Sequence, residues 1–227
     1  MREVVVDTET TGLDVAEGHR LVSIGCVEVQ DGRISGNEKE WLINPQRAIP
    51  EEAMAVHGLT NEALADKPTF SALAEEVMAF LGDAQLVMHN APFDMSFLNA
   101  ALRDCQLPTI GSGRVVDTLV LARRLFPSEP ASLDALCRRY DVSLRERQKH
   151  HGALLDARLL AKVYCLMAFG DQAELGLAVD RRKTADTEAR QPEQRAFKLQ
   201  QPTQQEQEAH SHMLSNLQES LWENADV

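Results

Sequence analysis

The stretch EVVVDTETTG, residues 3–12, decides the fold class. Its first five residues include three valines in a row, and β-branched side chains favour a strand. Asp7 and Glu9 follow two positions apart, and side chains at i and i+2 of a strand point to the same face of a sheet. The stretch therefore predicts a first strand over residues 3–7 whose end carries two carboxylates side by side.

The patterns that follow predict a mixed sheet that begins as an antiparallel meander. Alternating or short apolar runs typical of strands occur at residues 20–30, 34–43, 85–89 and 115–117. The Asp-Gly pair at 31–32 is a hairpin turn signal between two of them. Helical spacing of apolar side chains predicts helices at residues 70–81, 93–105, 118–126, 132–140 and 153–169. This order predicts an α/β fold with a mixed five-stranded sheet flanked by helices.

The composition changes after about Gly170. Residues 191–208 contain seven glutamines and two prolines and have little to bury, which predicts a flexible linker. Residues 209–222 regain apolar side chains at spacings of three and four, as in an amphipathic helix. We therefore expect a core and a flexible C-terminal tail, divided into residues 1–170, 171–183, 184–208 and 209–227.

Composition and charge limit the function classes. The chain has 227 residues, 44% of them hydrophobic, which predicts a globular core. A net charge of -12 argues against tight unaided binding to phosphates, but not against a nuclease that binds through metal ions or is held by partners. The four cysteines form no CxxC pair, and no apolar run suits a signal peptide or a membrane span. We expect a cytoplasmic protein with no membrane partner.

Two further acids lie where predicted helices begin. Asp94 ends HNAPFD after a strand, and Asp156 lies in HHGALLDA near the first turn of a long helix. The helix dipole alone could explain an acid at either position. If both converged with Asp7 and Glu9, the site would be lined by oxygen ligands, which suit Mg²⁺ or Mn²⁺. Spacing alone leaves convergence open.

A histidine stands close to the last of these acids. His151 lies five residues before Asp156, so within one helix the two side chains would point to different faces. Placement in a loop before Gly152 would instead let the imidazole reach the carboxylates. Taken alone, a histidine in such a place is more often a surface residue than a catalyst.

The strings DTETTG, HNAPFD and HGALLD, in this order, resemble the three motifs of the DEDDh family of 3′→5′ exonucleases. Within that family the chain is similar to the epsilon (proofreading) subunits of bacterial DNA polymerase III. The resemblance runs from about Glu3 to Ala168 and includes VHGLTNEALADKPTF, DTLVLARRLFP and SLDALCRRY. It implies an RNase H-like fold in residues 1–170 and two-metal hydrolysis at the 3′ end of DNA, releasing nucleoside 5′-monophosphates.

The resemblance also implies a role for each motif residue. Asp7 would bridge two divalent ions, Mg²⁺ or Mn²⁺. Glu9 and Asp156 would complete the first ion's ligands, and Asp94 would support the second, partly through water. His151 would act as the general base that takes a proton from the attacking water.

Two more positions match residues that the family uses near the terminal nucleotide. Glu52 and His57 are these positions, with His57 in the string VHGL. Together with Asp7, Glu9 and Asp156 they would form the substrate-binding site.

The tail is expected to bind partners. Residues 172–177, QAELGL, resemble a short motif that binds a sliding clamp, although the usual final phenylalanine is missing, which implies weak binding. The segment 209–227 is expected to dock on the polymerase III alpha subunit, and a small accessory subunit is a further expected partner. The side chains expected at these contacts are Gln172, Leu175, Leu177, Leu217, Leu221 and Trp222.

Two alternatives remain open. A DEDDh exoribonuclease that trims RNA would use the same four acids and histidine, although a compact RNA trimmer has no need of a linker and an anchor. A subunit that only assembles partners would have little use for an intact acid set. DNA and RNA substrates, tested with and without Mg²⁺, separate these readings.

Overall fold

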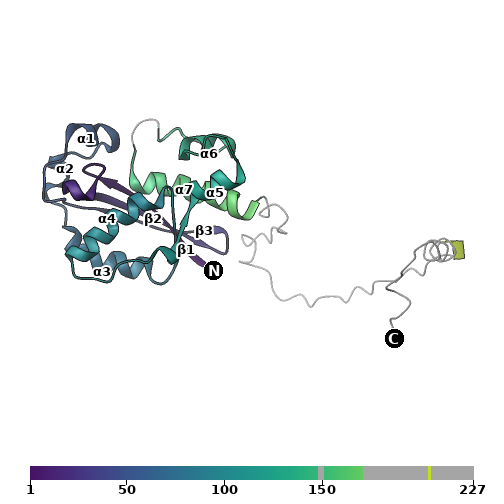
Figure 1. The fold of residues 1–227 in the computed structure, drawn as a ribbon, viewed down its shortest axis with the longest axis horizontal. Coiled ribbons are helices and arrows are strands. Elements are labelled where there is room, and N and C mark those ends of the chain that lie inside the picture. The colour runs from purple at the N-terminus through teal and green to yellow at the C-terminus, as the bar shows by residue number, and fades with distance from the viewer. Residues whose placement is uncertain (148–150, 171–203, 206–227) are drawn as a thin grey trace, which may run out of the picture. The chain divides into compact units, whose positions relative to one another are not determined.

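The computed structural model of the protein describes residues 1–147, 151–170 and 204–205. Their sheet has the strand order β3-β2-β1-β4-β5. Figure 1 labels the first three strands and the helices packed around the sheet. The first three strands pair antiparallel, whereas β4 pairs parallel with both β1 and β5. The predicted mixed five-stranded sheet with an initial meander is therefore confirmed. The strands are β1 (Arg2–Thr10), β2 (Leu21–Gln30), β3 (Arg33–Leu42), β4 (Gln85–Met88) and β5 (Val115–Asp117).

The five predicted helices all form. They are α3 (Phe70–Leu81), α4 (Ala91–Asp104), α5 (Thr118–Leu125), α6 (Leu133–Arg139) and α7 (Ala153–Phe169). Two short helices, α1 (Glu51–His57) and α2 (Asn61–Ala65), were not predicted. Their seven and five residues are too few to show a helical period, so periodicity could not reveal them. Single 3₁₀ turns lie at Val15–Glu17 and Ser112–Arg114.

Alternate residues of β1 face two separate cores. Val4 and Val6 pack into a cluster that includes Phe97 of α4, whereas Val5 packs with Leu160 of α7 in a second cluster. Helices α3 and α4 thus cover one face of the sheet, and α5, α6 and α7 cover the other. The odd-numbered residues of β1 share the face that carries α7.

The first strand is longer than predicted. It continues through Thr10 because β2 pairs with it as far as the Thr10–Leu21 partners, with a register shift between Glu9 and Thr10. Asp7 and Glu9 consequently both lie within the strand, where the pleat sets the direction of their side chains. The predicted strand ends at Asp7 and leaves Glu9 beyond it.

The predicted tail segments fall largely outside the described residues. This holds for residues 171–183, for the linker 184–208 apart from residues 204–205, and for residues 209–227. The six side chains expected to contact partners also lie outside the described residues: Gln172, Leu175, Leu177, Leu217, Leu221 and Trp222. In the described part of the chain, no helix has the length and hydropathy needed to cross a membrane.

Candidate active site

Three of the four predicted acids meet where β1 lies against α7. Each of Asp7, Glu9 and Asp156 offers a carboxylate oxygen within 4.8 Å of those of the other two. The strand's pleat places Asp7 and Glu9 on one face, and Asp156 reaches them from the first turn of α7. Asp7 and Glu9 are therefore paired by the local geometry of the strand, whereas Asp156 joins them through a long-range tertiary contact.

A glycine lets α7 approach the sheet this closely. Gly25 of β2 is the strand partner of Asp7, and a β-carbon built on it would collide with the backbone of Ala153 and Leu154 at the start of α7. Only a residue without a side chain fits there. The sequence shows a lone glycine inside a strand pattern at this position. Such a glycine indicates that another backbone approaches closely, so this contact could have been expected from the sequence.

The fourth acid, Asp94, lies beside the same strand. The α4 helix begins after Asn90, whose left-handed backbone (φ 65°) turns the chain out of β4. Asp94 is 4% exposed, and its Oδ1 accepts a hydrogen bond from Thr8 Oγ1 at 2.7 Å. The charge of Asp94 is among the causes that raise the pKa of Asp7, so Asp94 lies close to the cluster.

The carboxylate of Asp117 stabilises the turn between β4 and α4 by a hydrogen bond. Asp117 Oδ1 accepts hydrogen bonds from the backbone N–H groups of Asn90 (3.1 Å) and Leu119 (2.9 Å). In the same place His89 Nδ1 lies 2.9 Å from Thr118 Oγ1. The sequence analysis did not single out Asp117, although an aspartate before a helical run is a cap signal.

Burial and neighbouring carboxylates disfavour the charged forms of Asp7 and Glu9. Burial raises the pKa of Asp7 well above its usual range, and the charges of Asp94, Asp156 and Glu9 raise it further. Burial, then the charge of Asp156, raises the pKa of Glu9 to about 7. Burial also raises the pKa of Asp94 to about 7, against the lowering effect of the Thr8 hydrogen bond. A set of oxygen donors that repel one another fits a divalent cation between them.

One cation among the described residues already contacts this cluster. Arg147 Nε lies 2.7 Å from Asp156 Oδ1, and its Nη2 lies 3.0 Å from Asp156 Oδ2. Arg147 Nη1 also pairs with Asp134 of α6. The positive charge of Arg147 acts to lower the pKa of Asp7 and Glu9, which partly offsets the increase caused by burial and by the neighbouring acids. Sequence reasoning missed this residue because a polar loop has no periodicity to show where its side chains point.

His151 takes the loop position considered for it. It precedes Gly152, the residue before α7, and its Nδ1 lies 3.4 Å from Asp156 Oδ2. Its backbone N–H donates to the Val56 carbonyl of α1 at 3.4 Å. The side chain is 39% exposed, so the imidazole is open to solvent beside the cluster. The neighbouring His150 is outside the described residues.

The structure separates the two residues expected near the terminal nucleotide. His57 is 4% exposed, accepts the Leu59 N–H on Nδ1 at 3.1 Å, and has no hydrogen-bond partner on Nε2 among the described residues. Burial lowers the pKa of His57. His57 and His151 line one cavity of about 480 Å³. Glu52 is exposed in the first turn of α1 and does not line this cavity.

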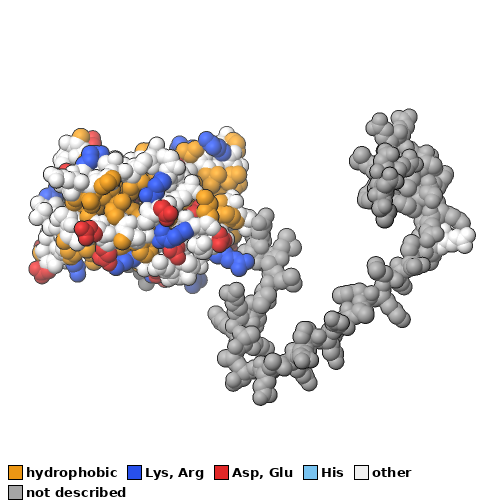
Figure 2. All heavy atoms as spheres, turned by 90° about the horizontal axis from the view of Figure 1, so that it is seen from below, with side chains coloured by type: hydrophobic (Ala, Val, Ile, Leu, Met, Phe, Trp, Pro, Cys, Tyr) orange, Lys and Arg blue, Asp and Glu red, His pale blue; other side chains and the backbone are white. Residues whose placement is uncertain are grey.

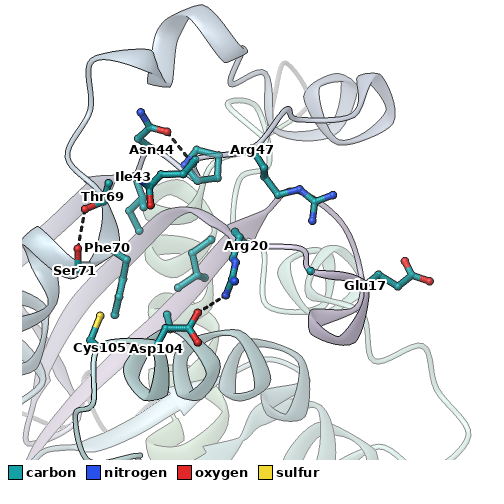
Figure 3. A pocket seen from close by; sticks show the side chains of 15 residues that line it. Glu17, Arg20, Ile43, Asn44, Arg47, Thr69, Phe70, Ser71, Asp104 and Cys105 are labelled. Atoms are coloured by element: carbon teal, nitrogen blue, oxygen red, sulfur yellow. Dashed lines mark hydrogen bonds and ion pairs between the residues drawn. The ribbon is translucent and has the colours of Figure 1, made fainter.

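Another cavity, of about 830 Å³, lies away from the acids (Figure 3). Arg20 and Asp104 form an ion pair in it, and Phe70 and Cys105 line it. None of the predicted site residues is among its lining residues. On the face drawn in Figure 2, acidic and basic side chains are interspersed with apolar ones and form no basic stripe. Both observations leave the acid cluster as the candidate site.

Comparisons with known proteins show the family of the chain. The family model described as Exonuclease (RNase_T) matches residues 4–164. The DNA polymerase III subunit epsilon of Rickettsia felis is 38% identical over 223 residues, covering 96% of this chain and 97% of that protein. Its Escherichia coli counterpart is 42% identical over 186 residues, covering 79% and 76%. A structure of exonuclease X in complex with 5′ overhanging duplex DNA has a TM-score of 0.57 and 31% identity, covering 73% of this chain and 90% of that one. The chain therefore belongs to the exonuclease family that contains the epsilon subunits of DNA polymerase III.

Proposed function

We propose that this exonuclease removes nucleotides from the 3′ end of DNA and proofreads for a replicative DNA polymerase III. The observation that carries the proposal is the triplet of Asp7, Glu9 and Asp156, with oxygens within 4.8 Å of one another and a histidine at its edge. Membership of the epsilon family supports the polymerase context.

The acids would hold the divalent ions on which this exonuclease family depends. Asp7, Glu9 and Asp156 would bind one ion, with Asp7 shared and Asp94 supporting the second, and either Mg²⁺ or Mn²⁺ suits oxygen ligands. Bound there, the ions would stabilise charge on the attacking and leaving oxygens of the scissile phosphodiester.

His151 would take the proton from the attacking water. The Asp156 carboxylate lies 3.4 Å from Nδ1, which favours the tautomer protonated on Nδ1 and leaves Nε2 free as the base. As the water oxygen bonds to phosphorus, the bond from phosphorus to the 3′ oxygen breaks, and that oxygen takes up a proton from solvent to become a 3′ hydroxyl. The products are a nucleoside 5′-monophosphate and a strand shorter by one residue.

The remaining expected substrate contacts differ in their support. His57 shares a cavity with His151, so we propose that it contacts the terminal nucleotide. Glu52 matches a family position and keeps its proposed role there, although it lies exposed on α1.

A 5′-labelled single strand tests the proposal, offered as DNA and as RNA of the same sequence, in Mg²⁺ and in EDTA. We expect shortening of the DNA one nucleotide at a time, only with Mg²⁺, and faster at a mismatched end because a frayed end costs less to unstack. Preferred degradation of the RNA would favour the exoribonuclease alternative. Undiminished activity of Asp7→Ala in EDTA would rule out the metal mechanism.

We also propose that residues 209–227 dock on the polymerase alpha subunit and that residues 184–208 act as the tether. The similarity to the Rickettsia felis epsilon subunit covers 96% of this chain, so it extends into these segments. A tether would raise the effective concentration of the exonuclease near the primer end to roughly millimolar. A chain ending at Lys183 should keep full activity on single strands and no longer co-purify with the polymerase. Retained co-purification would contradict the assignment.

For residues 172–177 we propose weak binding to a sliding clamp. Leu175 and Leu177 would fill an apolar pocket, with Gln172 hydrogen-bonded at its rim. Pull-down by the clamp should fall when Gln172→Ala is combined with Leu175→Ala, and an unchanged pull-down rejects the motif. A small accessory subunit remains a further proposed partner of the complex.

A further inference from the structure

The Arg147 side chain binds the one cluster acid that α7 supplies. Two of its nitrogens contact the two oxygens of Asp156 at 2.7 and 3.0 Å, the fork geometry in which guanidinium and carboxylate pair most strongly. The Arg147 side chain is 17% exposed and that of Asp156 only 6% exposed. This is a partly buried, two-point ion pair and not a surface contact.

The pair engages the oxygens that a metal ion would need. Asp156 has two carboxylate oxygens, and Arg147 hydrogen-bonds to both, with His151 also beside Oδ2. A divalent ion bound by Asp7, Glu9 and Asp156 must take at least one of them. The guanidinium charge would also repel such an ion at close range.

The guanidinium has a second anchor that does not depend on Asp156. Arg147 Nη1 pairs with Asp134 in the first turn of α6, so the side chain can stay bound to the protein after it releases Asp156. Arg138 pairs with the same Asp134 at 3.8 Å and is 70% exposed. It offers a matched arginine on the same acid without a contact to the cluster among the described residues.

We propose that Arg147 is a built-in counter-cation that occupies Asp156 in the metal-free protein and competes with the divalent ion for it. The inference rests on the proposed function, because it requires the acid cluster to bind the metal. The exonuclease would then be held folded and charge-compensated without metal, at the expense of metal affinity. An arginine that instead positioned Asp156 for the metal would have the opposite effect on affinity.

Calorimetric titration of the full chain with Mg²⁺ and with Mn²⁺ tests this without an activity assay. Arg147→Gln removes the charge and the fork, so we expect its dissociation constant for metal to fall by about tenfold or more. Arg147→Lys keeps the charge but loses the two-point geometry, and we expect a smaller fall. Arg138→Gln should bind metal as the unmodified protein does. Circular dichroism in EDTA checks that each variant is folded. If Arg147→Gln does not fold, the metal affinity of Arg147→Lys is compared with that of the unmodified protein instead.

The outcomes separate the inference from the function beneath it. Tighter metal binding by Arg147→Gln, or by Arg147→Lys if only that variant folds, supports the competition. Unchanged or weaker binding by the folded variant, while the unmodified protein binds metal saturably, overturns the competition and leaves the proposed function standing. Absence of saturable metal binding by the unmodified protein overturns both.

Discussion

The two ends of β1 carry acids on the same face of the sheet and against the same helix, but the side chains that surround these acids differ. Near its start, Glu3 is 2% exposed and accepts a hydrogen bond from Tyr164 Oη of α7 at 2.6 Å. Near its end, Asp7 and Glu9 meet Asp156 of α7, which pairs with Arg147 and lies beside His151. Glu3 meets a neutral hydroxyl donor, whereas Asp7 and Glu9 face other acids.

The difference separates a structural acid from candidate metal ligands. A buried carboxylate with a short hydrogen bond is satisfied by the fold and requires nothing from outside. Carboxylates gathered within 4.8 Å of one another, with two pKa values raised to about 7 in the site, are satisfied only by protons or a cation. Burial alone therefore does not mark the site, since Glu3 is as buried as Asp94.

The largest expected effect is at the acid end of the strand. Asp7→Asn keeps the shape of the side chain but removes the proposed shared metal ligand, so exonuclease activity should fall by about 10⁴-fold or more, since a catalytic metal contributes several kcal/mol to the reaction. Melting in EDTA should show no loss of stability, because the change relieves repulsion. The matched change at the other end, Glu3→Gln, should leave the rate within about twofold. Similar losses of activity in both variants would abolish the distinction drawn between the two ends.

His151→Ala should lower turnover by about 10²–10⁴-fold, the usual contribution of a general base. Alanine has no ring nitrogen that could accept the proton of the attacking water, so the variant lacks the base altogether. His150→Ala is the control and should keep the rate. A rate that depends on His150 and not on His151 would transfer the role to the neighbour.

The close approach of α7 to the sheet should be sensitive to one methyl group. Gly25→Ala places a β-carbon against the backbone of Ala153, which must move α7 and Asp156 away from Asp7. A displacement of about 1 Å at the ligands can cost about 10²-fold in rate. Gly111→Ala, where a β-carbon meets nothing within 4 Å, is the control. Single-strand degradation rates and melting curves of both variants measure the effect.

The raised pKa values predict how stability without metal depends on pH. The pKa of Glu9 is about 7 in the folded protein and near 4.5 when unfolded, so between these values the folded state binds more protons than the unfolded state. Stability therefore decreases as the pH rises from about 4.5 to about 7, with the contribution of this group amounting to a few kcal/mol at most. Acids with lowered pKa values, such as Glu28 and Glu38, act in the opposite direction.

The comparison with Glu9→Gln isolates the effect of this one carboxyl. Urea unfolding in EDTA at pH 5.5 and pH 8 should show the unmodified protein losing more stability than the variant over this interval. Saturating Mg²⁺ should remove most of the difference. Equal changes with pH in the two proteins would mean that Glu9 titrates normally.

The smallest expected effect is at the structural end. Tyr164→Phe leaves Glu3 buried without its hydrogen-bond donor, at a cost of about 1–3 kcal/mol in the free energy of unfolding. Exonuclease activity at a temperature where both proteins are folded should be unchanged. A large loss of activity would show that the two ends of the strand are coupled through α7.

Most of the sheet could be predicted from local patterns, and so could the shared face of Asp7 and Glu9. A strand's period of two places Asp7 and Glu9 on one face whatever surrounds them, and helical periodicity predicted α3 as Phe70–Leu81. The short helices α1 and α2 escaped because five to seven residues carry no measurable period. The tail segments stay predictions, since they lie outside the described residues.

By itself, the sequence determined which residue types were available and which face of β1 carried the carboxylates, because those properties depend on neighbours along the chain. The resemblance of three motifs supplied the expectation that distant acids converge. Only the tertiary structure decided how they meet: Asp156 reaches Asp7 because Gly25 leaves room for the backbone of α7. The pairing of Arg147 with Asp156 was equally beyond local patterns, since a contact between a loop and a helix depends on packing in three dimensions, which no spacing along the chain records.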